Sequence, residues 1–592
     1  MHSPQKFFSE LNEITGKVKK KPKINLHKND TLISGASEVA EIFNDKFSNL
    51  GDNHFRSTYI KDSEIATFEK SLFLRPVTVF EIIDKIKLLK PHKASGIDQL
   101  SSEILKCSLP VIAYPLVDLI NRSLSEGKFP TCLKDAKVYP LFKSGNKTNV
   151  DNYRSISILP VLSKVFEKVV YERLYDFLEK NNLIYSKQFG FRSNRSTIDA
   201  LAEITEKIRR NHAFNYTCIL LDLRKAFDTV NHERLIAKLE KYGVRGVALD
   251  WFKSYLTMRR QCVEIDGIRS DFRFILCGVP QGSILGPLLF ILYINDLPNI
   301  FTILDTYLFA DDTNCLHAHN KGEPFNLNVE LTKIPQWMKA NGLSLNIKKT
   351  QLLSFAKSPH IVELDGEIIE NSSFVKYLGL SLDKNFTFKY HIDEIVRKLG
   401  RHVFIISKLR HFVQTAILLK YYNVYVKSII QYGILIYGCT SYNQLKPIYL
   451  VQKKIIRLMY FRNKRTPSEN LFESANILDV YKLYLHEILK FAVKSVFQKH
   501  PSNYLNGLFE RTTVSSLMTR SVNRGEFDLP SPKNSNIKNS LKYRGTILLN
   551  YLISKQIDIT IPSSGIEKNY NVVLRLLSKI IKQENLTDLI FT

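Results

Sequence analysis

The chain has 592 residues, of which 44% are hydrophobic, and its formal net charge at pH 7 is +27. This length predicts several domains with sizeable cores, and the charge favours a polyanionic partner, although ribosomal and membrane-surface proteins are also basic. No apolar run is long enough to cross a bilayer, the start lacks the apolar core of a signal peptide, and the seven cysteines form no C-x-x-C pair. We therefore expect an intracellular protein, nuclear or cytoplasmic and not secreted, without a disulfide framework, a zinc knuckle or a membrane partner.

Residues 1–74 form a lead-in whose main feature is the basic run 17–23. Such a run is typical of a nuclear import signal or an RNA-contacting arm, and equally of a solvated, flexible segment. After the lead-in, residues 80–89 and 159–178 repeat apolar side chains at helical spacing, so both stretches are predicted to be helices.

Two cations flank a predicted hairpin between residues 142 and 154. Lys143 stands at its first end and Arg154 at its second. A triphosphate site needs cations of this kind, because negative charge spreads over the transferring phosphate. The chain has 84 lysines and arginines, so the alternative for any one of them is a solvated surface charge.

A strand is predicted over residues 216–223, where the apolar stretch 218–221 leads directly into Asp222. An aspartate in this position is rarely left unpaired, because burying an uncompensated charge costs several kcal/mol. We expect its partner to be the aspartate pair Asp311 and Asp312, further along the chain.

Glycine and proline mark the segment 278–287, which runs into the apolar stretch 288–294. Glycine allows unusual backbone torsions and the close approach of a ligand, which suits a binding loop. The alternative is a plain turn ahead of a helix, since glycine and proline punctuate most loops. The tripeptide Pro280-Gln281-Gly282, between two aspartate motifs, is more specific than such a turn.

Asp311 and Asp312 lie between two runs of strand-forming residues, 306–309 and 313–316. Successive side chains of a strand point to opposite faces, so both aspartates can serve one site only from a turn. Neighbouring like charges favour proton uptake or a bound cation, although aspartate also favours turns for its own hydrogen bonds. With Asp222 on a neighbouring strand, the pair could hold two Mg²⁺ ions, which clamp the oxygens of an in-line phosphoryl transfer. This combination predicts a polymerase.

Three further features follow the aspartate pair. Lys349, in the segment 346–350, is a candidate acid near a leaving group, or else a surface charge. Residues 377–379 are predicted to start a β-hairpin, and apolar residues recur at helical spacing from 391 to 458. Beyond about residue 480, helix-like runs alternate with polar stretches, without a catalytic pattern, a repeat or the carboxylate set typical of an RNase H domain.

In this order, the motifs resemble those of the reverse transcriptases of non-LTR retrotransposons of the LINE-like, jockey type. The resemblance runs from residue 75 to residue 460 and departs from the family pattern at Ser155, where proline is usual, and at Leu133 and Tyr437, where tryptophan is common. None of these three is a predicted metal ligand. The resemblance rests on three catalytic motifs (222–232, 278–287 and 309–312), two fingers segments (152–159 and 188–192), the fourth motif (346–350) and the primer grip (376–379).

The resemblance implies an α+β fold shaped as a right hand, with an antiparallel palm sheet and a mainly helical thumb and C-terminal region. It implies fingers and palm over residues 75–390, a helical thumb over 391–480, and a helical C-terminal appendage of unknown role over 481–592. Jockey-type elements usually carry an endonuclease ahead of the polymerase. Because the lead-in is too short for an endonuclease, we expect that domain to be missing. A separate endonuclease is then a candidate partner.

By resemblance, the chain is an RNA-directed DNA polymerase that extends a primer 3′-hydroxyl with deoxynucleoside triphosphates on an RNA template. Phe227 would lie under the nucleotide sugar and exclude a 2′-hydroxyl, and its alternative role is that of an ordinary core phenylalanine. Two Mg²⁺ ions, or Mn²⁺, would be held by Asp222, Asp311 and the carbonyl of Leu223. The remaining roles fall on Asp222, Asp311 and Asp312 (catalysis), on Arg154, Lys143, Gln281, Gly282 and Lys349 (substrate binding), and on Tyr377, Leu378 and Gly379 (primer grip).

Two other functions stay open. An RNA-directed RNA polymerase shares the two-metal palm but does not favour a bulky gate at Phe227. A catalytically silent or domesticated nucleic-acid-binding protein would keep the fold and bind a template without extending a primer. The oligomeric state is unknown from the sequence.

Overall fold

The structure is a computed structural model that describes most of the chain in two compact units. Unit 1 takes residues 1–184, 225–296 and 338–343, and unit 2 takes residues 185–224, 297–337 and 344–592. The basic run 17–23 lies outside the described residues. The described residues are 24–28, 31–49, 65–211, 213–321, 327–356, 362–511, 526–531, 535–557, 559, 566–583 and 586–591.

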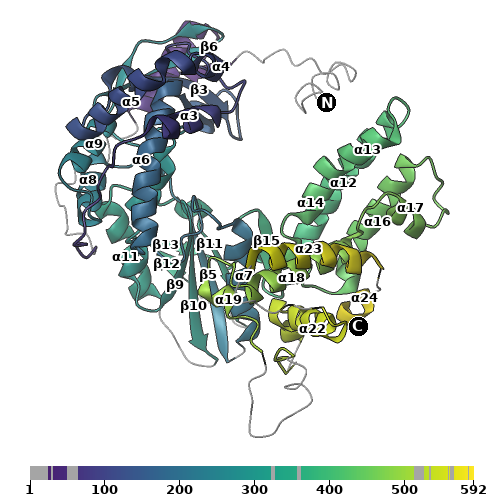
Figure 1. Ribbon diagram of the computed structural model, residues 1–592. Helices are drawn as coiled ribbons and strands as arrows, with labels where there is room; N and C mark the ends of the chain where they lie inside the picture. The colour runs from purple at the N-terminus through teal and green to yellow at the C-terminus, as the bar shows by residue number, and fades with distance from the viewer. Residues whose placement is uncertain are drawn as a thin grey trace. The chain divides into compact units, whose positions relative to one another are not determined.

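Unit 1 combines a sheet with several helices (Figure 1). Its elements are, in chain order, β1 (Leu26–Lys28), β2 (Thr31–Ile33), α2 (Ala36–Ser48), α3 (Val79–Lys87), α4 (Ser102–Cys107), α5 (Leu109–Glu126), η1 (Thr131–Leu133), β3 (Ala136–Phe142), η2 (Val150–Asn152), β4 (Tyr153–Ile158), α6 (Val161–Lys180), α8 (His232–Lys241), α9 (Val247–Leu256), β6 (Arg259–Ile265), β7 (Ile268–Arg269), β8 (Arg273–Ile275) and α10 (Leu285–Tyr293).

The sheet of unit 1 has the order β4-β3-β6-β7, and β8 also pairs with β6. β3 and β6 run parallel, whereas the other pairs are antiparallel. Helix α2 packs on this sheet, where its Val39 and Phe43 share a fully buried cluster with Val138 and Val263. Burial of these side chains is the main favourable term in packing the helix. Part of the segment 1–74 therefore contributes to the core of unit 1.

The two helices that apolar periodicity predicts are confirmed as α3 and α6. Thr78 caps α3, since its hydroxyl accepts a hydrogen bond from the Glu81 N–H at 3.2 Å. α6 begins directly after Pro160 and buries Phe166 and Val170 along one side.

Unit 2 combines a four-stranded sheet and the strand pairs β12-β13 and β14-β15 with many helices. Its elements are α7 (Thr197–Arg210), β5 (Phe214–Leu221), η3 (Leu297–Ile300), β9 (Leu304–Phe309), β10 (Asp312–Asn320), α11 (Asn328–Ala340, whose last residues belong to unit 1), η4 (Ile347–Lys349), β11 (Gln351–Ser354), β12 (Val362–Leu364), β13 (Glu367–Ile369), β14 (Phe374–Tyr377), β15 (Leu380–Asp383), α12 (Lys389–Leu409), α13 (Thr415–Tyr421), the π-helix η5 (Tyr422–Val426), α14 (Lys427–Gln431), α15 (Ile434–Tyr437), α16 (Tyr442–Met459), α17 (Glu469–Ser474), α18 (Val480–Val496), α19 (Asn503–Asn506), α21 (Ser535–Lys538), α22 (Leu541–Ser554), α23 (Ile566–Gln583) and α24 (Thr587–Phe591).

The four-stranded sheet has the order β11-β5-β10-β9, and every pair in it is antiparallel. β5 is buried from Tyr216 to Leu221, as expected for a central strand with a nearly continuous apolar run. The strand predicted at 216–223 is therefore confirmed, and Asp222 follows its last residue. The helical character predicted for 391–458 is confirmed by α12 to α16, of which α12 packs on α16 (Figure 1).

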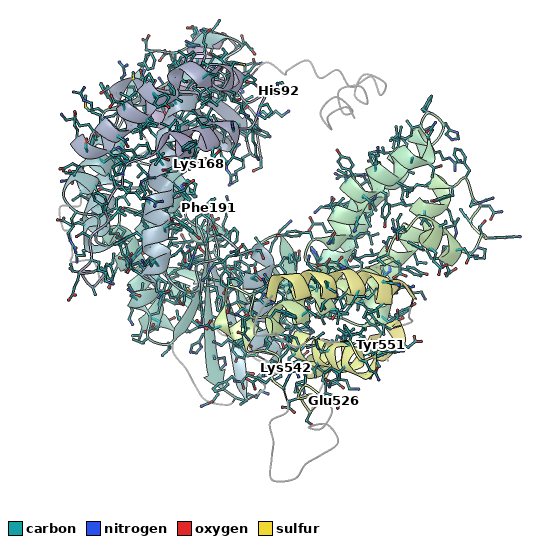
Figure 2. All side chains as sticks on the ribbon, in the orientation of Figure 1. His92, Lys168, Phe191, Glu526, Lys542 and Tyr551 are labelled. Atoms are coloured by element: carbon teal, nitrogen blue, oxygen red, sulfur yellow. The ribbon has the colours of Figure 1, made fainter. Side chains whose placement is uncertain are left out.

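Three carboxylates of α7 form hydrogen bonds with the C-terminal region. Asp199 lies 3.3 Å from a ring nitrogen of His500, and Glu203 accepts a hydrogen bond from the Ser502 hydroxyl at 2.6 Å. Glu206 accepts the first two backbone N–H groups of α22, at 2.7 and 2.9 Å; the second is that of Lys542, labelled in Figure 2. The region after residue 480 is thus part of the core of unit 2.

Among the helices that the structure describes, none combines the length and the apolar character that crossing a bilayer requires.

Candidate active site

The aspartate pair lies at a two-residue turn between β9 and β10. Phe309 pairs with Asp312, which leaves Ala310 and Asp311 as the turn residues. Ala310 has a φ of +55°, the left-handed conformation that tight hairpins of this length need. The predicted strands and the turn between them are confirmed, but only Asp311 of the pair lies in the turn, because Asp312 is already the first residue of β10.

Gln188 supports this turn from a neighbouring segment. Its fully buried side-chain oxygen accepts hydrogen bonds from the N–H groups of Gly190, at 2.9 Å, and Ala310, at 3.1 Å. A side chain at Gly190 would collide with the backbone of Ala310, so only glycine fits there. The segment 188–192, which resembles a fingers segment, lies in unit 2 and bonds to β9 through the Phe189 N–H. Phe191, labelled in Figure 2, is exposed at its edge.

Asp222 lies at the same end of the sheet as the turn. Leu221 of β5 pairs with Thr313 of β10, so Asp222 and Asp312 occupy neighbouring positions on adjacent strands. The Asn346 side-chain amide donates to a carboxylate oxygen of Asp222 at 2.9 Å, and its backbone N–H donates to the Asp222 carbonyl at 2.7 Å. No other hydrogen bond reaches this carboxylate from the part of the chain that the structure describes.

The charges at this end of the sheet act on Asp312. Partial burial, together with the negative charges of Asp311 and Asp222, raises the pKa of the Asp312 carboxyl to about 6, even though the side chain keeps access to solvent. Among the described residues, no group of three or more His, Cys, Asp or Glu side chains has the geometry to hold a metal ion. The donor set nevertheless fits Mg²⁺, because carboxylate oxygens are its preferred ligands and a cation would offset this accumulated charge.

The backbone of Leu223 is compatible with a ligand role. Leu223 and Leu345 form an antiparallel bridge, flanked by hydrogen bonds from Arg224 to Ser344 and from Asn346 to Asp222. In such a pair, the carbonyl of the central residue points away from the partner strand. The Leu223 carbonyl therefore makes no hydrogen bond within this strand pair.

Unit 1 holds the predicted gate residue. The Phe227 ring stacks on Phe290 of α10, with ring centres 4.2 Å apart and planes inclined by 25°. The Phe227 carbonyl accepts the Val279 N–H at 2.9 Å, so the gate segment and the glycine-rich loop are bound together. This stacking limits the freedom of the Phe227 ring.

The glycine-rich loop lies against β4. The Ser157 N–H donates to the Gln281 carbonyl at 2.9 Å, and any side chain at Gly282, whose φ is +145°, would collide with the Ser157 carbonyl. Gly282 is required here for this close approach and not merely as a turn residue.

The predicted hairpin with its two cations is confirmed as β3 and β4. The Lys143 N–H bonds to the Asn152 carbonyl at 2.8 Å, and Arg154 pairs with Leu141. Both cationic side chains are exposed. In unit 2, Lys349 is also exposed, at the end of η4, and its N–H bonds to the carbonyl of Asn346 at 2.9 Å.

The hairpin predicted at 377–379 is confirmed as β14 and β15. Tyr377 pairs with Leu380, and the turn residues Leu378 and Gly379 have φ values of +45° and +83°. The Tyr377 side chain is only 3% exposed, and burial and the charge of Asp312 raise the pKa of its hydroxyl well above the ordinary value. Contacts from this turn to another molecule would therefore come from Leu378 and Gly379.

Two supporting residues, Asn346 and Gln188, are not among the site residues that the sequence predicts. Each of them begins a segment that resembles a family motif. Their partners lie far away in the sequence, so only the order of the motifs hints at them.

Comparison with known proteins finds similarity to a family of polymerases. Residues 143–382 match the family model described as reverse transcriptase (RNA-dependent DNA polymerase). In Drosophila melanogaster, the probable RNA-directed DNA polymerase from transposon BS is 32% identical over 429 residues, covering 67% of this chain and 46% of that protein. The RNA-directed DNA polymerase from mobile element jockey is 30% identical over 66% of this chain and 44% of its own length. The probable RNA-directed DNA polymerase from transposon X-element is 28% identical over 75% of this chain and 50% of its own length. The chain thus spans about half the length of these relatives.

Proposed function

We propose that this chain, whose residues 143–382 match the reverse transcriptase family model, is the RNA-directed DNA polymerase of a non-LTR retrotransposon. The observation that carries the proposal is that Asp222 and the turn at Asp311 and Asp312 share one end of two paired strands. The chain extends a primer 3′-hydroxyl with deoxynucleoside triphosphates on an RNA template.

The α+β architecture accommodates the right-hand arrangement of this family. We assign the four-stranded sheet of unit 2 to the palm, and helices α12 to α16 to the thumb. The sheet of unit 1, with α3 to α6, is assigned to the fingers. No separate activity is assigned to the region after residue 480.

Asp222, Asp311 and the carbonyl of Leu223 would hold Mg²⁺ or Mn²⁺, with Asp312 beside them. Two such ions, when bound, supply activation of the primer 3′-oxygen and stabilisation of the departing pyrophosphate. Asn346 orients Asp222 for this task, because its amide holds one carboxylate oxygen at 2.9 Å.

The proposed nucleotide contacts are made by an aromatic ring, two residues of the glycine-rich loop and three cations. Phe227, stacked on Phe290, would exclude a 2′-hydroxyl from the position under the sugar. Gln281 and Gly282 would lie against the template base and sugar. The cations Arg154, Lys143 and Lys349 would neutralise the triphosphate and the leaving pyrophosphate. Leu378 and Gly379 would support the primer end, with Tyr377 packed beneath them.

Primer extension on an RNA template, with Mg²⁺ and deoxynucleotides, tests the proposal. Asp311→Ala is expected to lower the extension rate roughly a hundredfold or more, because it removes a metal ligand. Asp250→Ala, an exposed carboxylate on α9, is the matched control and should leave the rate unchanged.

The outcomes separate the alternatives. A parent protein that binds the template but extends nothing would indicate a nucleic-acid-binding protein without polymerase activity. A preference for ribonucleotides in the same assay would indicate an RNA-directed RNA polymerase. Extension that survives Asp311→Ala would overturn the site assignment.

A further inference from the structure

In unit 1, backbone hydrogen bonds join the segment 227–230, which contains the gate residue, to the glycine-rich loop 278–287. The Val279 N–H donates to the Phe227 carbonyl at 2.9 Å, and the Gly278 N–H donates to the Val230 carbonyl at 2.7 Å. Gly278 has a φ of +84°, and a side chain there would come within 2.7 Å of the Asp228 carbonyl. The two segments therefore hold each other at backbone contact distance.

Asp228 is the charged residue of the segment 227–230, and it has no role in the function proposed above. Its carboxylate accepts a hydrogen bond from the Gln281 side-chain amide at 2.8 Å, and the Ser155 hydroxyl lies 3.5 Å from the same oxygen. The charged groups that act on it are Lys225, on its own segment, and Arg154, on β4. Ser155, which stands where the family usually has proline, thus adds a donor facing Asp228.

The chemistry of the two side chains sets the orientation of the Gln281 amide. An ionised carboxylate only accepts hydrogen bonds, whereas an amide has one donor end and one acceptor end. Asp228 therefore selects the rotamer in which the Gln281 nitrogen faces inward and its carbonyl oxygen faces the other way. Without this partner, both orientations of the amide would be open.

We propose that Asp228 is a positioning residue, which acts on nucleotide binding through Gln281 by fixing the direction of its amide. This inference rests on the proposed function, since Gln281 is assigned there to the nucleotide and template site. A bound nucleotide then meets a preformed acceptor at Gln281, without the cost of ordering this side chain on binding.

The proposal predicts a pH dependence. Burial raises the pKa of Asp228 to about 6, although the Gln281 amide, Lys225, Ser155 and Arg154 lower it in part. Below this value the carboxyl carries a proton and becomes a donor itself, so it no longer distinguishes the two ends of the amide. Nucleotide affinity should therefore fall as the pH drops through 6.

A double-mutant cycle tests the coupling, using Asp228→Asn, Gln281→Leu and the double variant. The first readout is the equilibrium dissociation constant for a deoxynucleotide, measured on full-length protein with template and a chain-terminated primer. The second readout is the KM for the deoxynucleotide and kcat in primer extension. Asp228→Asn is expected to weaken nucleotide binding about tenfold, with little change in kcat, and to lose its effect when Gln281 is already leucine.

The pH profile supplies a measurement that does not depend on the folding of Asp228→Asn. Nucleotide affinity of the parent should decline below pH 6, and this decline should be smaller in Gln281→Leu although Asp228 is still present. Protonation of Asp312, whose pKa is also about 6, contributes equally in both proteins. An equal penalty for Asp228→Asn with and without Gln281, or an unchanged pH profile in Gln281→Leu, would overturn the proposal. If the parent binds nucleotide with this coupling but extends no primer, the proposed function fails and the positioning role stands.

Discussion

At the scale of single residues, Asp312 combines partial burial with two negative neighbours, Asp311 and Asp222. These effects raise its pKa from 3.8 to about 6. Because protonation is easier in the folded state than in the unfolded state, this group contributes stability that is fully present below about pH 4. The contribution is lost as the pH rises through 6, so the site is least stable at neutral pH without a cation.

Asp312→Asn should therefore stabilise the protein at pH 8 and have no effect at pH 4. We expect the melting temperature in Mg²⁺-free buffer to rise by roughly 1–3 °C at pH 8, a small shift because solvent screens this side chain. Thermal unfolding at both pH values measures the shift, with Asp250→Asn as the exposed control. The same shift at both pH values would show that charge at Asp312 is not its cause.

At the scale of elements, the turn between β14 and β15 is held by Tyr432, between α14 and α15. The Tyr432 hydroxyl donates to the Leu378 carbonyl at 2.6 Å and lies 3.3 Å from the Thr197 hydroxyl at the start of α7. Its ring faces Gly379, where a side chain would come within 3.0 Å of it. This tyrosine thus connects the assigned thumb to the assigned primer grip.

Tyr432→Phe keeps the ring against Gly379 and removes the hydrogen bond. We expect the KM for the primer to rise about three- to tenfold, with kcat nearly unchanged, because one hydrogen bond to the turn is lost. Steady-state primer extension measures both constants. Tyr442→Phe, at another partly exposed tyrosine of unit 2, is the control. A fall in kcat alone would contradict a role in primer binding.

The junction between α7 and α22 predicts a second effect at this scale. Glu206→Ala would leave the buried N–H groups of Leu541 and Lys542 without an acceptor, which is expected to cost about 2 kcal/mol or more. Glu206→Gln keeps an acceptor and should cost much less. Hydrogen exchange of α22 peptides measures the difference, and equal protection in both variants would show that Glu206 does not hold this helix.

At the scale of the whole molecule, the net charge of +27 predicts strongly salt-dependent binding to nucleic acid. Each neutralised phosphate releases counterions, so affinity for a template–primer duplex should fall by about two orders of magnitude or more between about 50 and 200 mM salt. Filter binding across this range measures the slope. Asp311→Ala should share the slope of the parent, because binding of the duplex backbone does not need the metal ligands. A flat salt response would exclude the phosphate backbone as the main contact.

Much of the candidate site follows from local sequence. The strand before Asp222, the turn at Asp311, the hairpin with Lys143 and Arg154, and the hairpin at 377–379 all form where the sequence predicts them. Strand periodicity and turn chemistry act over a few residues, so a single segment carries the whole signal. The order of the motifs along the chain adds the expected polymerase chemistry.

The contacts that hold the site residues in place could not be predicted from the sequence and are seen only in the tertiary structure. Asn346 is 124 residues from Asp222, Gln188 is 122 residues from Ala310, and Leu541 is 335 residues from Glu206. A polar residue has the same local sequence signal whether it faces solvent or a distant carboxylate, because its partner depends on which segments fold together. The sequence by itself determined which carboxylates lie at strand ends and turns. Only the tertiary structure decided which amides and backbone groups hold them in place.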